Sequence, residues 1–280
     1  MELSIRDDFC LEKIANSGQC FRARQLEEGW FRFITGQALL LIRQSRPGVF
    51  EARYGEAEWQ AVWAGYFDLG RDYAAIRRSI PQEDAWMRRA AAEGCGVRIL
   101  RQDPWETLVT FILSQRKSIP AIRQAVELLC ERYGEPIAAG GPRAFPTPTA
   151  LAGASEEGLA ACKPGYRAPY ILAAAGRVAA GETDLAGLAS LPDEALLSAL
   201  KGFYGVGEKV ARCTALFAYG RLGLAPVDTW IQKVIARAYG GRDPFLQYGP
   251  AAGVLQQYAF YYAQNHKAEL CGRSAGAACS

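Results

Sequence analysis

The chain has 280 residues, of which 50% are hydrophobic and 22% charged, and its formal net charge is +3. This composition is typical of a globular protein with ample core for one or two domains, and so mild a charge permits nucleic-acid binding without indicating it. No secretory signal and no apolar run long enough to cross a bilayer is expected. Eight scattered cysteines without metal-type pairing favour a reduced, cytoplasmic protein with free thiols.

The first part of the chain is predicted to contain strands. Short alternating or apolar runs at 30–36, 37–45 and 48–55 are separated by glycine, glutamine and an Arg-Pro-Gly turn. This pattern is typical of an antiparallel meander.

The rest of the chain is predicted to be helical. Asp103 is expected to cap a helix that begins at Pro104, and a second helix is expected between Ser118 and Gly134. Residues 138–150 are predicted to form a loop. Shorter helices are expected around 155–162, 166–180, 193–201 and 208–219, then after Asp228 and over 253–267. The sequence therefore predicts an α+β fold, mostly α, with an antiparallel sheet lobe at 1–98 and a helical lobe at 99–280.

Two glycines, Gly205 and Gly207, precede the helix predicted at 208–219. Glycines before a helix N-terminus expose backbone N–H groups that can bind an anion such as a DNA phosphate. The pair alone is equally consistent with a glycine-rich turn between two helices.

Lys209 and Asp228 are candidate catalytic residues. Lys209 lies at the edge of the apolar stripe of its helix, and a partly desolvated lysine can act as a nucleophile. A solvated surface lysine is the alternative. Asp228 is a good helix N-cap, and an aspartate there is expected to stay ionised and to stabilise positive charge that develops in a reaction. Capping and catalysis do not exclude each other.

"GVGEKVARC" at 205–213 and "APVDTWIQKVIARAYG" at 225–240 resemble the hairpin, lysine and aspartate of the helix-hairpin-helix (HhH-GPD) DNA glycosylase superfamily. In that family the lysine marks the bifunctional glycosylase/lyase branch. The resemblance implies that Lys209 is the nucleophile, that Asp228 assists it, and that Gly205 and Gly207 bind DNA.

Further motifs resemble the 8-oxoguanine DNA glycosylases. "NSGQCFRAR" at 16–24 is similar to a family motif whose glycine, here Gly18, presents a carbonyl to the flipped base. The oxidised base has an N–H at N7 where guanine has an acceptor, so a fixed carbonyl favours the lesion. "YGPAAGVLQQYAFYYA" at 248–263 resembles the closing helix, which implies that Gln256 reads the base edge and Phe260 stacks on the base. Cys213 would lie on the opposite face of the base. Taken alone, the motif around Gly18 is also consistent with a plain turn, Phe260 with a core aromatic, and Cys213 with a buried thiol.

The segments that are expected to face the orphaned partner base resemble the family only in part. "KPGYRAPYI" at 163–171 is similar to the stretch that supplies a wedging tyrosine and an arginine for the orphan base, here Tyr166 and Arg167. Where eukaryotic members carry asparagines, this chain has Gln115, Arg116, Lys117 and Ser118, of which Arg116 and Lys117 are predicted to contact DNA. The family's second arginine is replaced by Ala121, and a phosphate-contacting histidine by Trp230. This pattern favours a bacterial-type member with reduced reading of the opposite base.

No metal and no cofactor are predicted. Some relatives bind an iron–sulfur cluster through four closely spaced C-terminal cysteines, whereas only Cys271 and Cys279 lie near the end of this sequence. The implied partner is double-stranded DNA containing oxidised guanine. We expect a monomer that has no membrane association and acts in the bacterial cytoplasm on the nucleoid.

The resemblance implies base-excision repair: removal of 8-oxoguanine from duplex DNA and a nick at the abasic site by β-elimination through a lysine Schiff base. An alkylated-purine DNA glycosylase of the same superfamily is the alternative, against which Lys209, Cys213, Gln256 and Phe260 argue together. A non-catalytic helix-hairpin-helix DNA-binding module is a third possibility, but it would need neither Lys209 nor Asp228.

Overall fold

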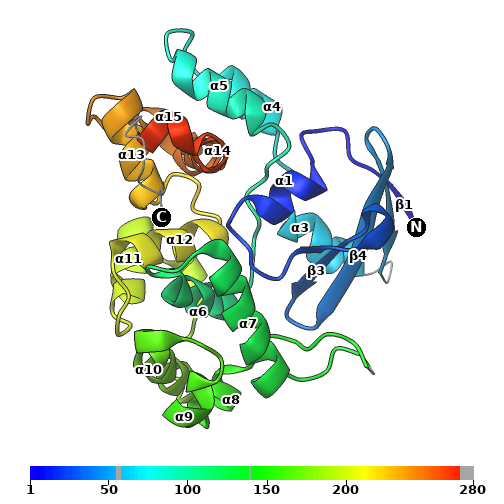
Figure 1. Cartoon of the computed structure of the whole chain (residues 1–280), viewed down its shortest axis with the longest axis vertical. Coiled ribbons are helices and arrows are strands. Elements are labelled where there is room, and N and C mark those ends of the chain that lie inside the picture. The colour runs from blue at the N-terminus through cyan, green and yellow to red at the C-terminus, as the bar shows by residue number, and fades with distance from the viewer. Residues whose placement is uncertain (55–57, 139, 272–280) are drawn as a thin grey trace.

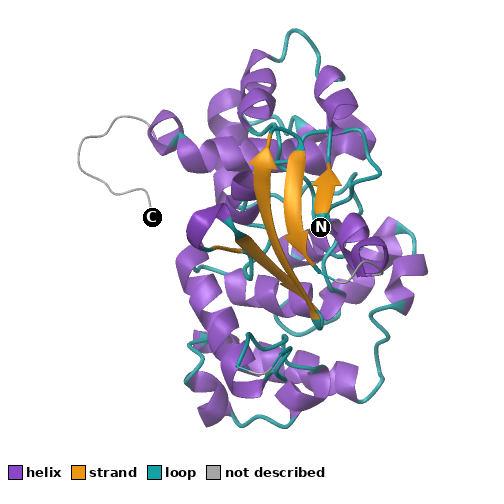
Figure 2. Ribbon diagram, turned by 90° about the vertical axis from the view of Figure 1, so that its right-hand side faces the viewer, coloured by secondary structure: helices purple, strands orange, loops and turns teal. Residues whose placement is uncertain are grey.

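An antiparallel five-stranded sheet with strand order β1-β5-β4-β3-β2 occupies the N-terminal part of the protein (Figure 2). The computed structural model describes residues 1–54, 58–138 and 140–271. The strands are β1 (Glu2–Ser4), β2 (Arg24–Gln25), β3 (Phe31–Thr35), β4 (Ala38–Arg46) and β5 (Val49–Arg53). The three predicted strands are confirmed as β3, β4 and β5. The other two strands have only three and two residues, too few to show an alternation in the sequence.

One face of the sheet forms a hydrophobic core. In the β3–β4 pair, Phe33 lies opposite Leu40 and Phe31 opposite Ile42, so these side chains share that face. It is covered by α1 (Leu11–Asn16), the π-helical turn η2 (Trp59–Trp63) and α3 (Ala64–Tyr66), which contribute further buried side chains to the same cluster. Figure 1 shows α1 and α3 between the sheet and the helical part of the molecule.

The helical part surrounds a second, larger core and supplies the elements that carry the predicted site. Its α-helices are α4 (Tyr73–Arg78), α5 (Ala85–Glu93), α6 (Pro104–Ser114), α7 (Ile119–Tyr133), α8 (Pro148–Ala152), α9 (Glu156–Ala160), α10 (Ala168–Ala179), α11 (Asp193–Lys201), α12 (Glu208–Phe217), α13 (Thr229–Ala238), α14 (Ala252–Asn265) and α15 (Lys267–Cys271). Short 3₁₀ turns are η1 (Glu27–Gly29), η3 (Gly165–Arg167), η4 (Gly187–Ser190) and η5 (Phe245–Ala251).

Most helix predictions are confirmed. Asp103 caps α6 by accepting a hydrogen bond of 2.8 Å from the Glu106 N–H, and Pro104 is the first helical residue. The loop prediction for 138–150 was wrong at its end, where α8 begins at Pro148. Thr147 accepts a hydrogen bond of 3.1 Å from the Ala150 N–H, so "Thr-Pro" there is a helix cap and first residue.

Helix α14 packs against the end of α5. Its buried Tyr258 packs so closely on the end of α5 that a methyl group added at Gly94 would lie 2.6 Å from its ring. Helices α4 and α5 precede residue 98 in the chain, yet Tyr73 and Met87 belong to the helical core. The domain division at residue 98 stays a prediction. Within the described ranges, no helix has the length and apolar character needed to cross a membrane.

Candidate active site

Lys209 lies in the first turn of α12, immediately after the glycine hairpin, and is half-buried. Its Nζ donates a hydrogen bond of 3.0 Å to Oγ of Ser114 at the end of α6, and it lies 5.0 Å from the ring centroid of Phe111. Ser114 Oγ donates its own proton to the Phe111 carbonyl at 2.7 Å. A lone pair of the hydroxyl is therefore directed at the lysine. These contacts fix Lys209 in one position.

Asp228 is the N-cap of α13 and accepts a hydrogen bond of 2.8 Å from the Ile231 N–H. Burial raises the pKa of this carboxyl above its ordinary value, whereas the helix N–H groups and the Lys209 ammonium oppose the rise. The helix start was expected to keep Asp228 ionised, and burial works against that expectation. A carboxylate in this environment favours a neighbouring positive charge and accepts a proton more readily than an exposed aspartate.

Cys213 lies one turn after Lys209 and only 4% of it is exposed. Burial raises the pKa of its thiol to about 11. The charge of Lys209 opposes this rise, and the charge of Asp228 adds to it. The thiol is therefore neutral at neutral pH. The mutual electrostatic influence of Lys209, Cys213 and Asp228 shows that the three predicted residues lie together.

The loop that carries Gly18 is fixed by a buried glutamine. Gln19 donates a hydrogen bond of 2.8 Å to the Arg98 carbonyl, and its amide oxygen accepts one of 2.7 Å from the Leu100 N–H. Gly18 has a φ of +76°, and an added methyl group would lie 2.9 Å from Cε1 of Phe260. The left-handed backbone and this close approach both require glycine.

Helix α14 brings the predicted base-reading residues against this loop. Phe260 contacts Gly18, and Gln257 donates a hydrogen bond of 2.5 Å to the carbonyl of Ser17. Gln256 is only 4% exposed, and its Oε1 has no hydrogen-bond partner within the described chain. A buried acceptor without a partner is costly, and a donor on a bound base would satisfy it.

The hairpin connects α11 and α12. Gly205 has a φ of +79°, and an added methyl group would lie 2.4 Å from the Tyr170 ring, so the backbone packs directly on that ring. Gln115 Nε2 donates a hydrogen bond of 3.2 Å to the Gly205 carbonyl. Gly207 is the N-cap of α12, and nothing lies within 4 Å of the position where a side chain would begin. The helix N-terminus is therefore accessible to an anion.

The residues predicted to face the orphan base lie on two adjoining loops. Lys117 Nζ donates a hydrogen bond to the carbonyl of Lys163, and burial and Arg167 lower the pKa of this lysine. Tyr166 is 52% exposed, whereas Arg167 is only 4% exposed, with its guanidinium 4.2 Å from the Tyr166 ring centroid. Arg116 is exposed and has a φ of +49°. The DNA-contacting roles stay predictions, and Arg167 would have to leave its stacked position to reach a base.

Two positions where this chain departs from the family pattern are also described. Ala121 lies in the first turn of α7. Trp230, where the family has a histidine, lies 4.4 Å from Lys233 Nζ and 5.7 Å from Lys267 Nζ, measured to its ring centroid. Two ammonium groups thus adjoin the position of the missing histidine.

Two side-chain contacts of the site were missed by the sequence analysis. Ser114 accepts a hydrogen bond from Lys209, and the only hint of this in the sequence was its position at the end of the "DPWETLVTFILS" helix. Gln257 anchors the Gly18 loop, and the only hint in the sequence was that it directly follows Gln256. Neither pairing follows from local spacing, because the partners are 95 and 240 residues apart.

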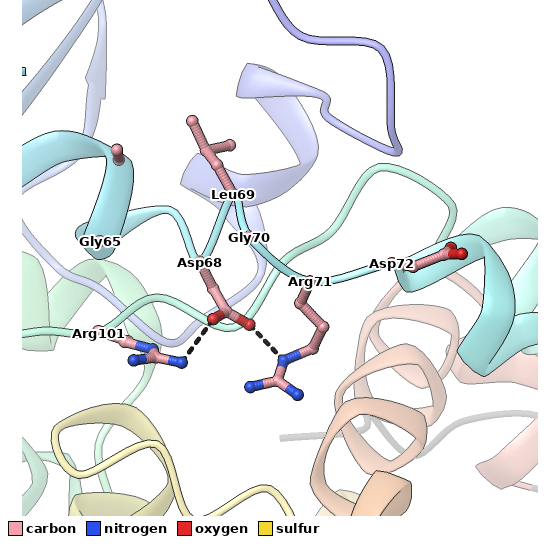
Figure 3. A pocket seen from close by; sticks show the side chains of 8 residues that line it. Gly65, Asp68, Leu69, Gly70, Arg71, Asp72 and Arg101 are labelled. Atoms are coloured by element: carbon pink, nitrogen blue, oxygen red, sulfur yellow. Dashed lines mark hydrogen bonds and ion pairs between the residues drawn. The ribbon is translucent and has the colours of Figure 1, made fainter. Parts of the chain in front are cut away.

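The pocket in Figure 3 contains none of the predicted site residues. The Asp68 carboxylate accepts hydrogen bonds of 2.6 Å from Arg71, 2.7 Å from Arg101 and 3.0 Å from the Tyr73 hydroxyl. The carboxylate is thus fully paired and stabilises the fold. No group of three metal-ligating side chains occurs among residues 1–54, 58–138 and 140–271. The predicted absence of a cluster at Cys271 and Cys279 concerns side chains outside the described residues.

Both halves of the chain match models of known protein families. Residues 3–108 match the model of the 8-oxoguanine DNA glycosylase N-terminal domain, and residues 109–244 match that of the HhH-GPD superfamily base excision DNA repair protein. The fold is similar to MBOgg1 in complex with a low affinity DNA ligand, with 34% identity, a TM-score of 0.89, and coverage of 94% of this chain and 95% of that one.

A second similar structure is the 8-oxoguanine glycosylase/lyase of Clostridium acetobutylicum in complex with double-stranded DNA containing cytosine opposite 8-oxoG. It shares 33% identity and a TM-score of 0.87, with coverage of 95% of this chain and 98% of that one. The N-glycosylase/DNA lyase of Saccharomyces cerevisiae is 32% identical over 174 residues, which span 57% of this chain but only 46% of the yeast protein. The chain belongs to the HhH-GPD superfamily of base excision DNA repair proteins, in the branch that carries the 8-oxoguanine DNA glycosylase N-terminal domain.

Proposed function

We propose that this protein is a bifunctional 8-oxoguanine DNA glycosylase and lyase. The observation that carries the proposal is the position of Lys209, held on Ser114 and grouped with Asp228 and Cys213 directly after the hairpin. The activities named for the similar proteins, N-glycosylase/DNA lyase and 8-oxoguanine glycosylase/lyase, support it.

In this mechanism Lys209 Nζ, once deprotonated, attacks C1′ of the extruded nucleotide. The N–C1′ bond forms as the C1′–N9 bond breaks, and the base leaves with the electron pair and takes up a proton. The Asp228 carboxylate stabilises the positive charge that develops on the sugar. The sugar ring then opens to a Schiff base. Loss of a proton from C2′ expels the 3′ phosphate with the C3′–O electrons and nicks the strand.

Selection of the oxidised base is assigned to Gly18, Gln256 and Phe260. The Gly18 carbonyl accepts the N7–H that only the lesion has, and it is held in place by the bonds of Gln19 and Gln257 on either side. The unpartnered Gln256 Oε1 accepts from a donor on the base edge. Phe260 stacks on the base, and the neutral Cys213 thiol contacts the other face.

The duplex is proposed to lie across the hairpin and the two adjoining loops. Gly205 and Gly207 bind a backbone phosphate, Arg116 and Lys117 contact the backbone, and Tyr166 enters the vacated stack. We propose that the protein acts as a monomer. We also propose that the protein acts in the cytoplasm, on nucleoid DNA, without membrane association.

Borohydride trapping on duplexes that contain different lesions tests the proposal. We expect a covalent protein–DNA adduct with 8-oxoguanine opposite cytosine, and little or none with undamaged DNA or with an alkylated purine. Lys209→Gln should abolish the adduct, whereas Lys201→Gln, which removes an exposed lysine of α11, should retain it. An adduct of normal yield in Lys209→Gln would place the nucleophile elsewhere, and trapping mainly on alkylated purines would favour the other branch of the superfamily.

A further inference from the structure

The hairpin carries an aromatic side chain that the proposed mechanism does not use. Tyr204 directly precedes Gly205 and is 63% exposed, even though it is a large, partly apolar side chain. Tyr166 lies in the turn η3 (Gly165–Arg167), which we call the wedge loop, and is likewise 52% exposed. Large exposed apolar side chains can mark a binding surface, and proteins that bind single-stranded nucleic acids combine basic grooves with exposed aromatic side chains.

The two exposed tyrosines are joined by a third. Tyr170 packs edge-on against Tyr204, with ring centroids 4.7 Å apart and an interplanar angle of 84°, and against Tyr166 at 6.1 Å and 80°. Because the Gly205 backbone also rests on the Tyr170 ring, the hairpin and the wedge loop share one aromatic support. Tyr204 therefore has a fixed position relative to both predicted DNA contacts.

The charges around Tyr204 suit a polyanion. Gln115 binds the Gly205 carbonyl, so the loop that carries Arg116 and Lys117 adjoins the hairpin. Lys117 in turn contacts the loop that leads to Tyr166. The nearest acidic residue on α12, Glu208, is paired with Lys201 at 3.0 Å and with Arg212 at 2.7 Å. Its negative charge is thereby offset.

We propose that Tyr204 is a DNA-contacting residue whose ring packs against the deoxyribose next to the phosphate held by the hairpin. This inference rests on the proposed function, because it takes the occupant of this surface to be the lesion-containing strand of a duplex. A phosphate on the N–H groups at Gly207 brings its own sugar within reach of a side chain three residues earlier. The ring then buries its exposed face while Tyr170 supports its edge.

The first test compares Tyr204→Ala and Tyr204→Phe with the wild type. Duplex affinity is measured by fluorescence anisotropy, and 8-oxoguanine excision by single-turnover kinetics. The Ala variant should bind about tenfold more weakly, because the apolar surface that the ring buries against the sugar is lost, whereas Phe keeps the ring and should stay within about twofold. The salt dependence of binding should not change, because a neutral ring displaces no counterion. Leu26→Ala, which removes an exposed apolar side chain from the sheet lobe, is the control and should bind like the wild type.

A second measurement uses the wild-type protein and does not depend on folding of a variant. Tetranitromethane should nitrate Tyr204 in the free protein, and an undamaged duplex should suppress nitration at that residue, read by peptide mass spectrometry. Wild-type affinity for Tyr204→Ala, or nitration of Tyr204 unchanged by saturating duplex, would overturn the inference while leaving 8-oxoguanine excision intact. Conversely, if the wild type binds duplexes through Tyr204 but excises no 8-oxoguanine, the proposed function is wrong and the Tyr204 contact still stands.

Discussion

The Lys209 ammonium and the Ser114 hydroxyl form a hydrogen bond of 3.0 Å between the start of α12 and the end of α6. The serine proton is already donated to the Phe111 carbonyl, so Ser114 can only accept from the lysine. In the proposed mechanism, the side chain of Ser114 therefore orients Lys209 without taking part in bond making. Lysine has four rotatable side-chain bonds, and an anchor at its end removes much of that freedom.

Ser114→Ala is expected to slow single-turnover excision about threefold to tenfold, which corresponds to the loss of one orienting hydrogen bond. Duplex affinity should not change, and Ser114→Thr, which keeps the hydroxyl, should restore most of the rate. Ser118→Ala is the matched control, because that serine lies four residues further on, just before α7, is exposed and makes no capping bond. A full rate in Ser114→Ala would show that packing on Phe111 alone positions the lysine.

Asp228→Asn separates charge from capping. The amide oxygen can still accept from the Ile231 N–H, so the melting temperature should hold, whereas excision should fall about a hundredfold or more because the charge is lost. Since burial raises the pKa of Asp228, the wild-type rate should decline with acidification at a higher pH than an exposed aspartate would cause. The variant should lack this decline. A collapsed melting temperature with normal activity per folded molecule would make Asp228 a cap only.

Much of the fold and the site could be predicted from the sequence because the signals are local. The caps at Asp103 and Asp228 and the glycine hairpin each occupy a few adjacent residues and are found where expected. The hydrogen bonds of Lys209 to Ser114 and of Gln257 to Ser17 depend instead on segments that meet only in the folded chain. The rise in the pKa of Asp228 has the same origin, since desolvation depends on everything packed around the carboxyl.

A pH effect on stability is expected from Glu106, which is buried in α6 and has one carboxyl oxygen without a hydrogen-bond partner. Burial raises the pKa of Glu106 to about 8, against the opposing effect of Arg22. A raised folded-state pKa means that the protonated acid favours folding, and this contribution is lost as the pH rises from the ordinary glutamate range to about 8. Glu106→Gln, a neutral isostere, should flatten the change in the free energy of unfolding over that window. Urea unfolding at several pH values measures it, and an equally steep profile in the variant would assign the effect to other groups.

The orphan base is expected to be read loosely. Arg167 is predicted to contact the orphan base, for which it would have to leave its stacked position on Tyr166, whereas Ala121 has no donor at the position where a second arginine is expected. A bidentate contact to a base contributes about 1–3 kcal/mol of discrimination, roughly tenfold to a hundredfold. Ala121→Arg should therefore steepen the preference for cytosine by about tenfold in single-turnover excision opposite C, T, G and A. Gln124→Arg adds the same charge one turn further along α7 and should strengthen binding to all four duplexes alike. The contradicting result has two parts: the wild type prefers cytosine as steeply as a relative with both arginines, and Ala121→Arg does not change that preference. This result would show that other residues read the orphan base.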